Sequence, residues 1–285
     1  MKLLVLGCNG MAGHLISLYL KEQGYNVEGF ARKKSSFVET IVGDARNTEL
    51  LRKTIENGGY ETVINCIGVL NRSAEDNHET AILLNTYLPH FLAKITEKTK
   101  TQIIQISTDC VFSGNRGRYV ESDFPDGKSF YDRSKALGEI VNVKDVTLRM
   151  SIVGPDTNKN GIGLVNWFMQ QNGPVKGYKR ALWTGQTTLQ LAKTIEHVVA
   201  QRIHGLYNMV PEEIISKYDM LCLFNKHLRR DKIEIIPEEY FVIDKSLIRT
   251  NYESFNYIVP GYDQQIEELG DWMRKHKTLY PQYTL

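Results

Sequence analysis

Hydrophobic residues in the first half of the chain come in short runs that alternate with helical patterns. The run at 3–6 is wholly apolar, as in strands that are buried on both faces of a parallel sheet. A helical pattern follows at about 12–23, and Gly24 is expected to end it. The alternation continues to Met150, with strands at 26–31, 40–42, 62–66, 102–107 and 146–150, and helices at 47–57, 78–98 and 131–141.

This strand–helix–strand order predicts βαβ units and an α/β fold, a Rossmann-type doubly wound parallel sheet. Asn47 is expected to cap the helix at 47–57, and Pro89 is expected to kink the long helix at 78–98. After Met150 the rhythm breaks. We therefore expect one domain at 1–150, to which a helix near 188–201 returns, and a smaller α/β portion at 151–285 packed on it.

Composition and charge exclude several classes of protein. The 285 residues include 35 Lys and Arg against 33 Asp and Glu, a net charge of +2, which gives no basic surface for nucleic acid. The four cysteines form no CxxC pair and no histidine cluster lies near them, so no metal site is expected. Because no apolar run is long enough for a signal peptide core or a membrane span, we expect a cytoplasmic protein without a membrane partner.

A glycine-rich turn directly follows the first strand. Gly7, Gly10 and Gly13 stand between that strand and the first helix, where glycine allows a tight bend and close approach of the backbone to a pyrophosphate. The N-terminus of the helix adds free N–H groups and a partial positive charge. In this context the motif predicts a nucleotide site, and its GxxGxxG spacing resembles the extended short-chain dehydrogenases/reductases.

The end of the second strand separates the two nicotinamide cofactors. An NAD site has an acidic residue there for the ribose 2′-hydroxyl, whereas a 2′-phosphate requires cations. This chain places Arg32, Lys33 and Lys34 after the strand and no acid. The sequence therefore favours NADP(H), with NAD(H) and a merely solvated basic loop as the alternatives.

A second constellation carries acid–base chemistry. Tyr131 and Lys135 are four residues apart on a predicted helix, so the two side chains share one face, and the ammonium is expected to lower the pKa of the phenol. Thr108, at the end of a predicted strand, supplies a hydroxyl that can share a substrate oxygen with Tyr131. Such a pair can stabilise and protonate a carbonyl oxygen during reduction.

The surrounding residues resemble the dTDP-4-dehydrorhamnose reductase family. The pattern reads STDxVFxG from Ser107, GRYVESD from Gly117 and YxxxKALGE from Tyr131, and segments at 148–154, 185–188 and 205–208 are also similar. The resemblance implies NADPH-dependent reduction of the 4-keto group of a nucleotide-activated 6-deoxy sugar, linked to dTDP or, as an N-acetylamino analogue, to UDP. The product would enter surface polysaccharide biosynthesis.

The resemblance also assigns roles to positions of this chain. It implies that Thr108, Tyr131 and Lys135 are catalytic, and that Val69, Cys110 and Trp183 contact the sugar. With the glycine turn and the basic loop, the expected cofactor contacts are Gly7, Asn9, Gly10, Met11, Gly13, Arg32, Lys33, Asp44, Ala45, Cys66, Ile67, Gly68, Tyr131 and Lys135.

One departure from the family pattern leaves alternatives open. Cys110 stands where the family usually has Tyr, and it resembles the cysteine of GDP-fucose synthase, which works with a histidine to epimerise the sugar before reduction. The stretch 149–194 contains no histidine, so we interpret Cys110 as a small residue that shapes the sugar pocket. A bifunctional epimerase-reductase, a non-catalytic NADP-binding regulatory subunit and a homodimer stay open.

Overall fold

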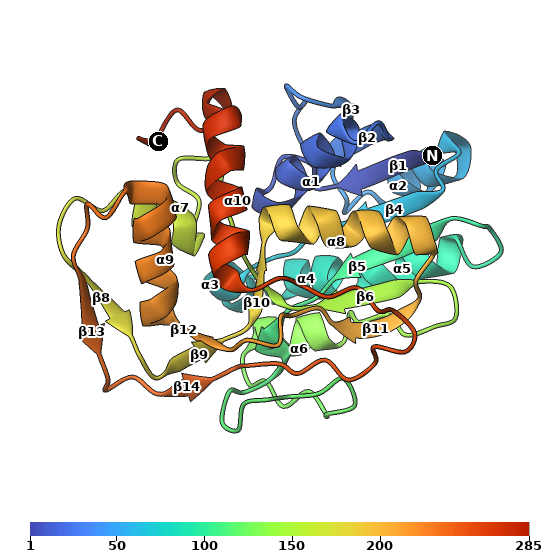
Figure 1. The fold of residues 1–285 in the computed structure, drawn as a ribbon. Helices are drawn as coiled ribbons and strands as arrows, with labels where there is room; N and C mark the ends of the chain where they lie inside the picture. The colour runs from blue at the N-terminus through green and yellow to red at the C-terminus, as the bar shows by residue number, and fades with distance from the viewer. Residues whose placement is uncertain (285) are drawn as a thin grey trace.

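The computed structural model describes residues 1–284, which form a mostly parallel α/β structure around one large sheet (Figure 1). All seven strands of that sheet are parallel, in the order β11-β6-β5-β4-β1-β2-β3. The strands are β1 (Lys2–Leu6), β2 (Asn26–Ala31), β3 (Glu39–Val42), β4 (Thr62–Asn65), β5 (Gln102–Ile106), β6 (Val146–Arg149) and β11 (Gly205–Asn208). The predicted doubly wound parallel sheet is confirmed.

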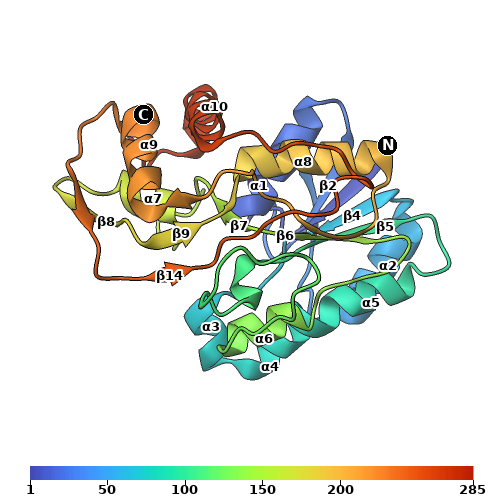
Figure 2. The same cartoon turned by 60° about the horizontal axis from the view of Figure 1, so that its bottom comes forward.

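Helices cover both faces of the sheet (Figure 2). One face carries α1 (Met11–Glu22) and α8 (Thr188–Gln201), with α10 (Tyr262–Lys275) packed beside α8. The other carries α2 (Thr48–Gly58), α5 (Leu88–Ile95) and α6 (Phe130–Ala136). Leu3 and Val5 of β1 pack into the core on the first face and Leu4 and Leu6 into the core on the second, as the two-residue period of a strand requires.

The long helix expected at 78–98 is divided. It consists of α4 (His78–Ala81), a π-helix η1 (Ile82–Tyr87) and α5, and it is preceded by a short helix α3 (Asn71–Asp76) that the sequence pattern missed. The predicted kink at Pro89 is therefore wrong in its position, because Pro89 lies in the first turn of α5 and the irregular turn precedes it. Since Pro89 has no N–H for the Asn85 carbonyl, the chain widens there into a π-turn. Asn47 caps α2 as predicted, accepting a hydrogen bond from the Leu50 N–H at 3.0 Å.

The second half of the chain forms small sheets beside the carboxyl edge of the large one. Three are present: β7 (Ser151–Val153) with β10 (Gly185–Thr187); β9 (Ala181–Trp183) between β12 (Ile215–Ser216) and β14 (Ile243–Asp244); and β8 (Val175–Tyr178) with β13 (Ile235–Glu238). Helix α9 (Lys217–Arg229) packs with these strands, and α7 (Leu164–Met169) packs against α9 (Figure 1). A cavity lies between these elements and the carboxyl ends of the long strands.

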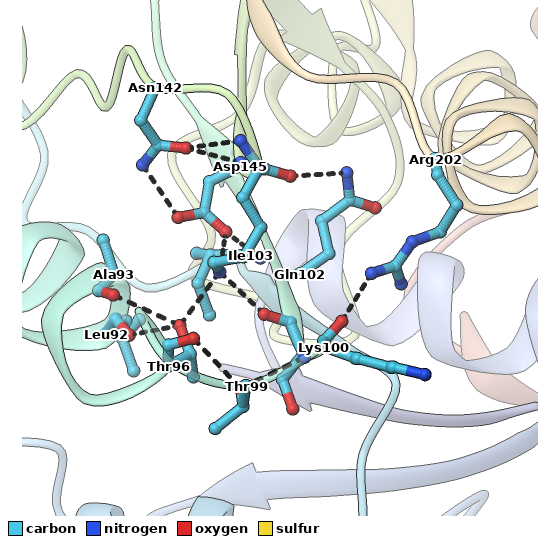
Figure 3. A network of polar contacts seen from close by, with 12 residues as sticks. Leu92, Ala93, Thr96, Thr99, Lys100, Gln102, Ile103, Asn142, Asp145 and Arg202 are labelled. Carbon is cyan, nitrogen blue, oxygen red and sulfur yellow. Dashed lines mark hydrogen bonds and ion pairs between the residues drawn. The ribbon is translucent and has the colours of Figure 1, made fainter.

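The opposite, amino edge of the sheet is closed by polar side chains (Figure 3). The fully buried Asp145 accepts hydrogen bonds from the Ile103 N–H at 2.8 Å and from Asn142 Nδ2 at 2.9 Å. Arg202, just after α8, donates to the carbonyls of Glu61 and Lys100. These bonds join α8 to the ends of β4, β5 and β6.

A buried ion pair lies below the carboxyl edge. Glu139 accepts from Arg149 Nε at 2.9 Å and Nη2 at 2.6 Å, and from Ser107 Oγ at 2.7 Å. The side chains of Glu139 and Arg149 are 7% and 2% exposed, so each charge depends on the other for its compensation. Arg149 also lies 5.0 Å over the ring of Phe112.

We predict that Glu139→Gln destabilises the fold strongly, because it leaves the Arg149 guanidinium buried without a counter-charge. The expected loss is about 3–5 kcal/mol in the free energy of unfolding, measured by urea denaturation. Glu56→Gln is the control, because its pair with Arg52 is exposed and worth about 0.5 kcal/mol or less. Equal losses in the two variants would contradict the role assigned to the buried pair.

Candidate functional site

The glycine turn between β1 and α1 has the geometry of a nucleotide-binding loop. Gly7 adopts φ +78°, in the left-handed region, and its carbonyl accepts from the Gly10 N–H at 2.9 Å. A Cβ on Gly13 would lie 2.1 Å from the Gly7 carbonyl oxygen, so this close approach requires glycine. No side chain caps the N-terminus of α1 and no acid lies in its first turn, which leaves the N–H groups that precede His14, from Met11 to Gly13, for an anion.

The residues after β4 form the other side of this crevice. A Cβ on Gly7 would lie 3.1 Å from Ile67 Cγ1 and 3.3 Å from the carbonyl carbon of Cys66, so the two predicted cofactor segments are in contact. The buried Asn65 orients this loop, since its Oδ1 accepts from the Ile67 N–H at 3.2 Å and its Nδ2 donates to Gln105 at 2.7 Å. This crevice lies where the strand order reverses, the usual ligand site of a doubly wound sheet.

The basic loop after β2 lies beside the glycine turn. Asn9 Nδ2 donates to the Lys33 carbonyl at 2.8 Å, and the side chains of Arg32 and Lys33 are exposed. Asp44, the acidic residue that the sequence singled out nearby, is paired with Arg46 at 2.7 Å, and this hydrogen bond holds the pKa of the carboxyl below its usual range. Arg46 is a cation that the sequence reasoning missed, and it leaves the loop net positive.

Thr108 and Tyr131 meet at the carboxyl edge of the sheet. Thr108 follows β5, and its Oγ1 accepts from the Cys110 N–H and donates to Asp109 Oδ1, both at 3.1 Å. Tyr131 lies in the first turn of α6, which Ser129 caps by accepting from the Asp132 N–H at 3.0 Å. Burial raises the pKa of the Tyr131 phenol above its usual value, and a hydrogen bond with Thr108 opposes that rise.

Lys135 lies one turn further along α6 and is also buried. Its Nζ donates to the Ile106 carbonyl at 2.7 Å, and burial lowers its pKa to about 8, against the opposing charge of Glu139. The carboxylates of Asp109 and Asp132 raise the pKa of the Tyr131 phenol further. The expectation that Lys135 lowers the pKa of the phenol is therefore wrong in this structure, because Lys135 is held by a strand carbonyl.

Asn85 joins two segments of the site by hydrogen bonds, and the sequence analysis missed it. This fully buried residue of the π-helix η1 accepts from the Val69 N–H at 2.8 Å and donates to the Val69 carbonyl at 2.9 Å. It also donates to Ser134 Oγ at 3.0 Å, on the same helix as Tyr131. A Cβ on Gly138 would lie 1.9 Å from the Asn85 carbonyl oxygen, the one to which Pro89 has no N–H to donate. The proline within a helical pattern was the available signal.

A cavity of about 910 Å³ opens next to these residues. Of the predicted sugar contacts, Cys110 and Trp183 line it, whereas Val69 packs in the hydrophobic cluster of Tyr131. Its wall carries four cations, one carboxylate and several aromatic rings, namely Lys159, Lys176, Lys217, Lys245, Asp109, Trp167, Tyr178, Trp183 and Phe241. The cavity therefore suits an anionic ligand with flat or apolar parts.

Two lysines act on the inner end of the cavity, and sequence reasoning found neither. Lys217 Nζ lies 4.8 Å over the ring of Trp183, and burial lowers its pKa to about 8. The charges of Lys245 and Lys217 oppose the burial that raises the pKa of Asp109. Burial raises the pKa of Cys110 to about 12, so this residue is a neutral thiol near pH 7. Across residues 1–284, no histidine lines this cavity.

The described residues form neither a metal-binding cluster nor a helix that could span a membrane. Within 1–284, no three His, Cys, Asp or Glu side chains are grouped so as to hold a metal ion. None of the helices described is both long and apolar enough to cross a membrane.

Comparison with known sequences assigns the family. Residues 1–252 match the sequence model of the RmlD substrate binding domain. The chain belongs to this family. The predicted resemblance to dTDP-4-dehydrorhamnose reductases is thereby confirmed, and the predicted enzyme class and nicotinamide cofactor agree with membership of the RmlD family.

Individual relatives differ in what their names describe. A probable low-salt glycan biosynthesis reductase, Agl14 of Haloferax volcanii, is 32% identical over 52% of this chain. The match also covers 52% of Agl14, so this chain spans about half the length of that relative. The spore coat polysaccharide biosynthesis protein SpsK of Bacillus subtilis is 29% identical over 84% of each chain. Methionine adenosyltransferase 2 subunit beta of Xenopus tropicalis is 24% identical over 77% of this chain and 70% of its own.

Solved structures share the fold over nearly the whole chain. A dTDP-4-dehydrorhamnose reductase from Clostridium acetobutylicum superimposes with a TM-score of 0.75 at 24% identity, covering 96% of this chain and 100% of its own. Another, from Bacillus anthracis in complex with NADP, gives 0.78 at 19% identity and covers 94% and 98%. At these identities the likeness concerns the fold.

We predict that Lys135→Met stabilises the protein at pH 7. The folded-state pKa of about 8 lies below the ordinary 10.5, so the burial cost of the ammonium is full below pH 8 and disappears between pH 8 and 10.5. The thermal midpoint should rise by about 2–4 °C at pH 7, and this gain should shrink at pH 9.5. Exposed Lys53→Met is the control. A variant less stable than wild type at pH 7 would contradict this reading of the site.

Proposed function

We propose that this protein is an NADPH-dependent reductase of the C4 keto group of a nucleotide-activated 4-keto-6-deoxy sugar. The observation that carries the proposal is the placement of Thr108, Tyr131 and Lys135 between two binding regions. On one side lies the glycine turn with its free N–H groups, and on the other the cationic cavity. A hydroxyl, a phenol and an ammonium at the junction of such sites suit carbonyl reduction.

The cofactor residues of this chain suit NADP(H). The amides at the start of α1 would hold the pyrophosphate, and Arg32, Lys33 and Arg46 would face the 2′-phosphate, with Asp44 already neutralised by its ion pair. When bound, the nicotinamide supplies the hydride. We place cofactor binding in residues 1–150, with α8 returning to that unit, and substrate binding mainly in residues 151–285, which supply most of the cavity wall.

Tyr131 is the proton donor in this mechanism. Its raised pKa keeps the phenol protonated at neutral pH, so a proton is available as the carbonyl oxygen gains negative charge. Thr108 can turn its single hydroxyl hydrogen from Asp109 Oδ1 to the same oxygen and so orient the carbonyl. Lys135 is charged below about pH 8 and lies one helical turn from Tyr131, so we assign it to the cofactor, as the family resemblance implies.

The cavity supports a nucleotide diphosphate as the handle of the substrate. Its lysines can compensate a diphosphate, its aromatic rings can pack against a base or sugar, and its volume is in the range of small-molecule sites. We propose dTDP-4-dehydrorhamnose or a UDP-linked N-acetylamino analogue as the substrate, with the product used in surface polysaccharide biosynthesis. The resemblance to SpsK, a polysaccharide biosynthesis protein, supports this setting.

The two alternative functions are a non-catalytic regulatory role and epimerisation before reduction. The likeness to a methionine adenosyltransferase subunit supports a non-catalytic regulatory role, but a regulatory subunit has no need of the buried Thr108–Tyr131 pair beside a cavity. Epimerisation before reduction needs a base beside the sugar. The raised pKa of Cys110 and the lack of histidine in the described cavity wall argue against that pair of groups.

Tyr131→Phe tests the reductase directly. We expect NADPH binding to be unchanged and kcat to fall about 10²–10⁴-fold, the usual contribution of a general acid, in an NADPH-oxidation assay with dTDP- and UDP-4-keto-6-deoxy sugars. Tyr60→Phe, which removes a buried phenol that donates to Glu28 far from the site, should keep wild-type rates. A Tyr131→Phe rate above about a tenth of wild type, or no turnover by wild type with NADPH bound, would refute the assignment.

Cofactor choice is tested by removing the basic loop. Wild-type protein should have a higher kcat/KM for NADPH than for NADH, and Arg32→Ala combined with Lys33→Ala should reduce this ratio at least about tenfold through loss of charge-assisted hydrogen bonds. The rate with NADH should stay within about twofold. Lys94→Ala, an exposed lysine on α5, is the matched control. If wild type uses both cofactors equally, the loop is merely solvated.

A further inference from the structure

The C-terminal segment returns to the glycine turn. It follows α10 as the red end of the chain in Figure 1 and includes the 3₁₀ turn η3 (Lys277–Leu279). His14 of α1, which is fully buried, has Nδ1 3.0 Å from the Gly10 carbonyl oxygen and Nε2 2.9 Å from the Tyr280 hydroxyl. A carbonyl only accepts, so Nδ1 carries the hydrogen and Nε2 accepts from Tyr280. Burial lowers the pKa of His14, which keeps it neutral.

The same segment holds the loop at 154–163. The Tyr283 ring stacks on Tyr280 with centroids 5.9 Å apart. Its hydroxyl accepts from the Asp156 N–H at 3.0 Å and donates to Asn166 Oδ1 at 2.7 Å. Gln282 Nε2 donates to the Asp156 carbonyl at 2.5 Å. Two tyrosines three positions apart thus join the glycine turn to this loop.

The loop in turn belongs to both binding regions. Asn166 Nδ2 donates to the carbonyls of Lys159 and Gly161 at 3.0 and 2.6 Å, and 159–162 line the cavity. At its far end, a Cβ on Gly163 would lie 2.9 Å from Met11 Sδ, in the first turn of α1. The loop at 154–163 therefore connects the wall of the cavity to the glycine turn.

We propose that Tyr280 and Tyr283 are positioning residues that couple the cofactor site to the substrate site. This inference rests on the proposed function. Ordering of the glycine turn by NADP(H) would fix His14 and, through the two tyrosines, fix Asn166 and the cavity wall before the nucleotide sugar arrives. Coupling of this kind is reciprocal, so each ligand must tighten the binding of the other by the same factor.

The test measures that factor without any turnover. UDP and dTDP are titrated into the protein by calorimetry, with and without saturating NADP⁺, and the ratio of the two dissociation constants is the coupling. We expect wild-type protein to bind its preferred nucleotide about 5–20-fold more tightly with NADP⁺ present. The ratio should fall within twofold of unity in Tyr280→Phe and in Tyr283→Phe, each of which removes one hydroxyl and keeps the ring.

Tyr207→Phe is the matched control, because Tyr207 is equally buried and donates to Ser254 at 3.0 Å away from both sites. It should keep the wild-type ratio even if its thermal midpoint falls as far as those of the tail variants, whereas a merely structural tail would lower midpoints alone. A wild-type ratio of one, or an unchanged ratio in both tail variants, overturns the coupling and leaves the reductase intact. If wild type binds neither NADP⁺ nor the nucleotides, the proposed function falls with it.

Discussion

The buried pairing of Glu139 with Arg149 is the constraint on which the carboxyl edge of the sheet, with Thr108 and the nearby Lys135, depends. Glu139 joins Ser107, the neighbour of Thr108, to β6, and its charge opposes the burial that lowers the pKa of Lys135. Arg149 reaches Asn208 of β11, which donates to the carbonyls of Tyr119 and Ile248. One carboxylate thus fixes the relation between Thr108, Lys135, two strands and a loop of the second half.

The negative charge of Glu139 also explains why two neighbouring groups of the site differ in their ionisation. Burial works against the ammonium of Lys135, and Glu139 supplies the compensation that keeps it charged near neutral pH. No comparable charge favours ionisation of the neighbouring Tyr131, so its phenol stays protonated. The site therefore keeps a proton on each of two groups in surroundings that exclude water, as a proton donor for a carbonyl requires.

The sequence predicted what is local and missed what is made by distant segments. The apolar run of β1 and the glycines that follow it are determined by neighbouring residues, and the structure contains both where they were expected. The π-helix was missed because its cause, the missing N–H of Pro89, was interpreted as a kink at the proline itself. Lys217 escaped notice because its partners, Asp109 and Trp183, are far from it in the chain and meet it only after folding.

The pKa of Lys217, the lysine over Trp183, affects both the enthalpy of ligand binding and the number of protons exchanged on binding. With a pKa of about 8, a fraction of Lys217 is neutral in mildly alkaline solution. An anion placed beside it stabilises the charged form and raises this pKa, so protons are taken up from the medium as the ligand enters. The enthalpy of association then depends on the ionisation heat of the buffer, and affinity weakens as the solution becomes more alkaline. Binding of an anion in the cavity would therefore be coupled to proton uptake by Lys217.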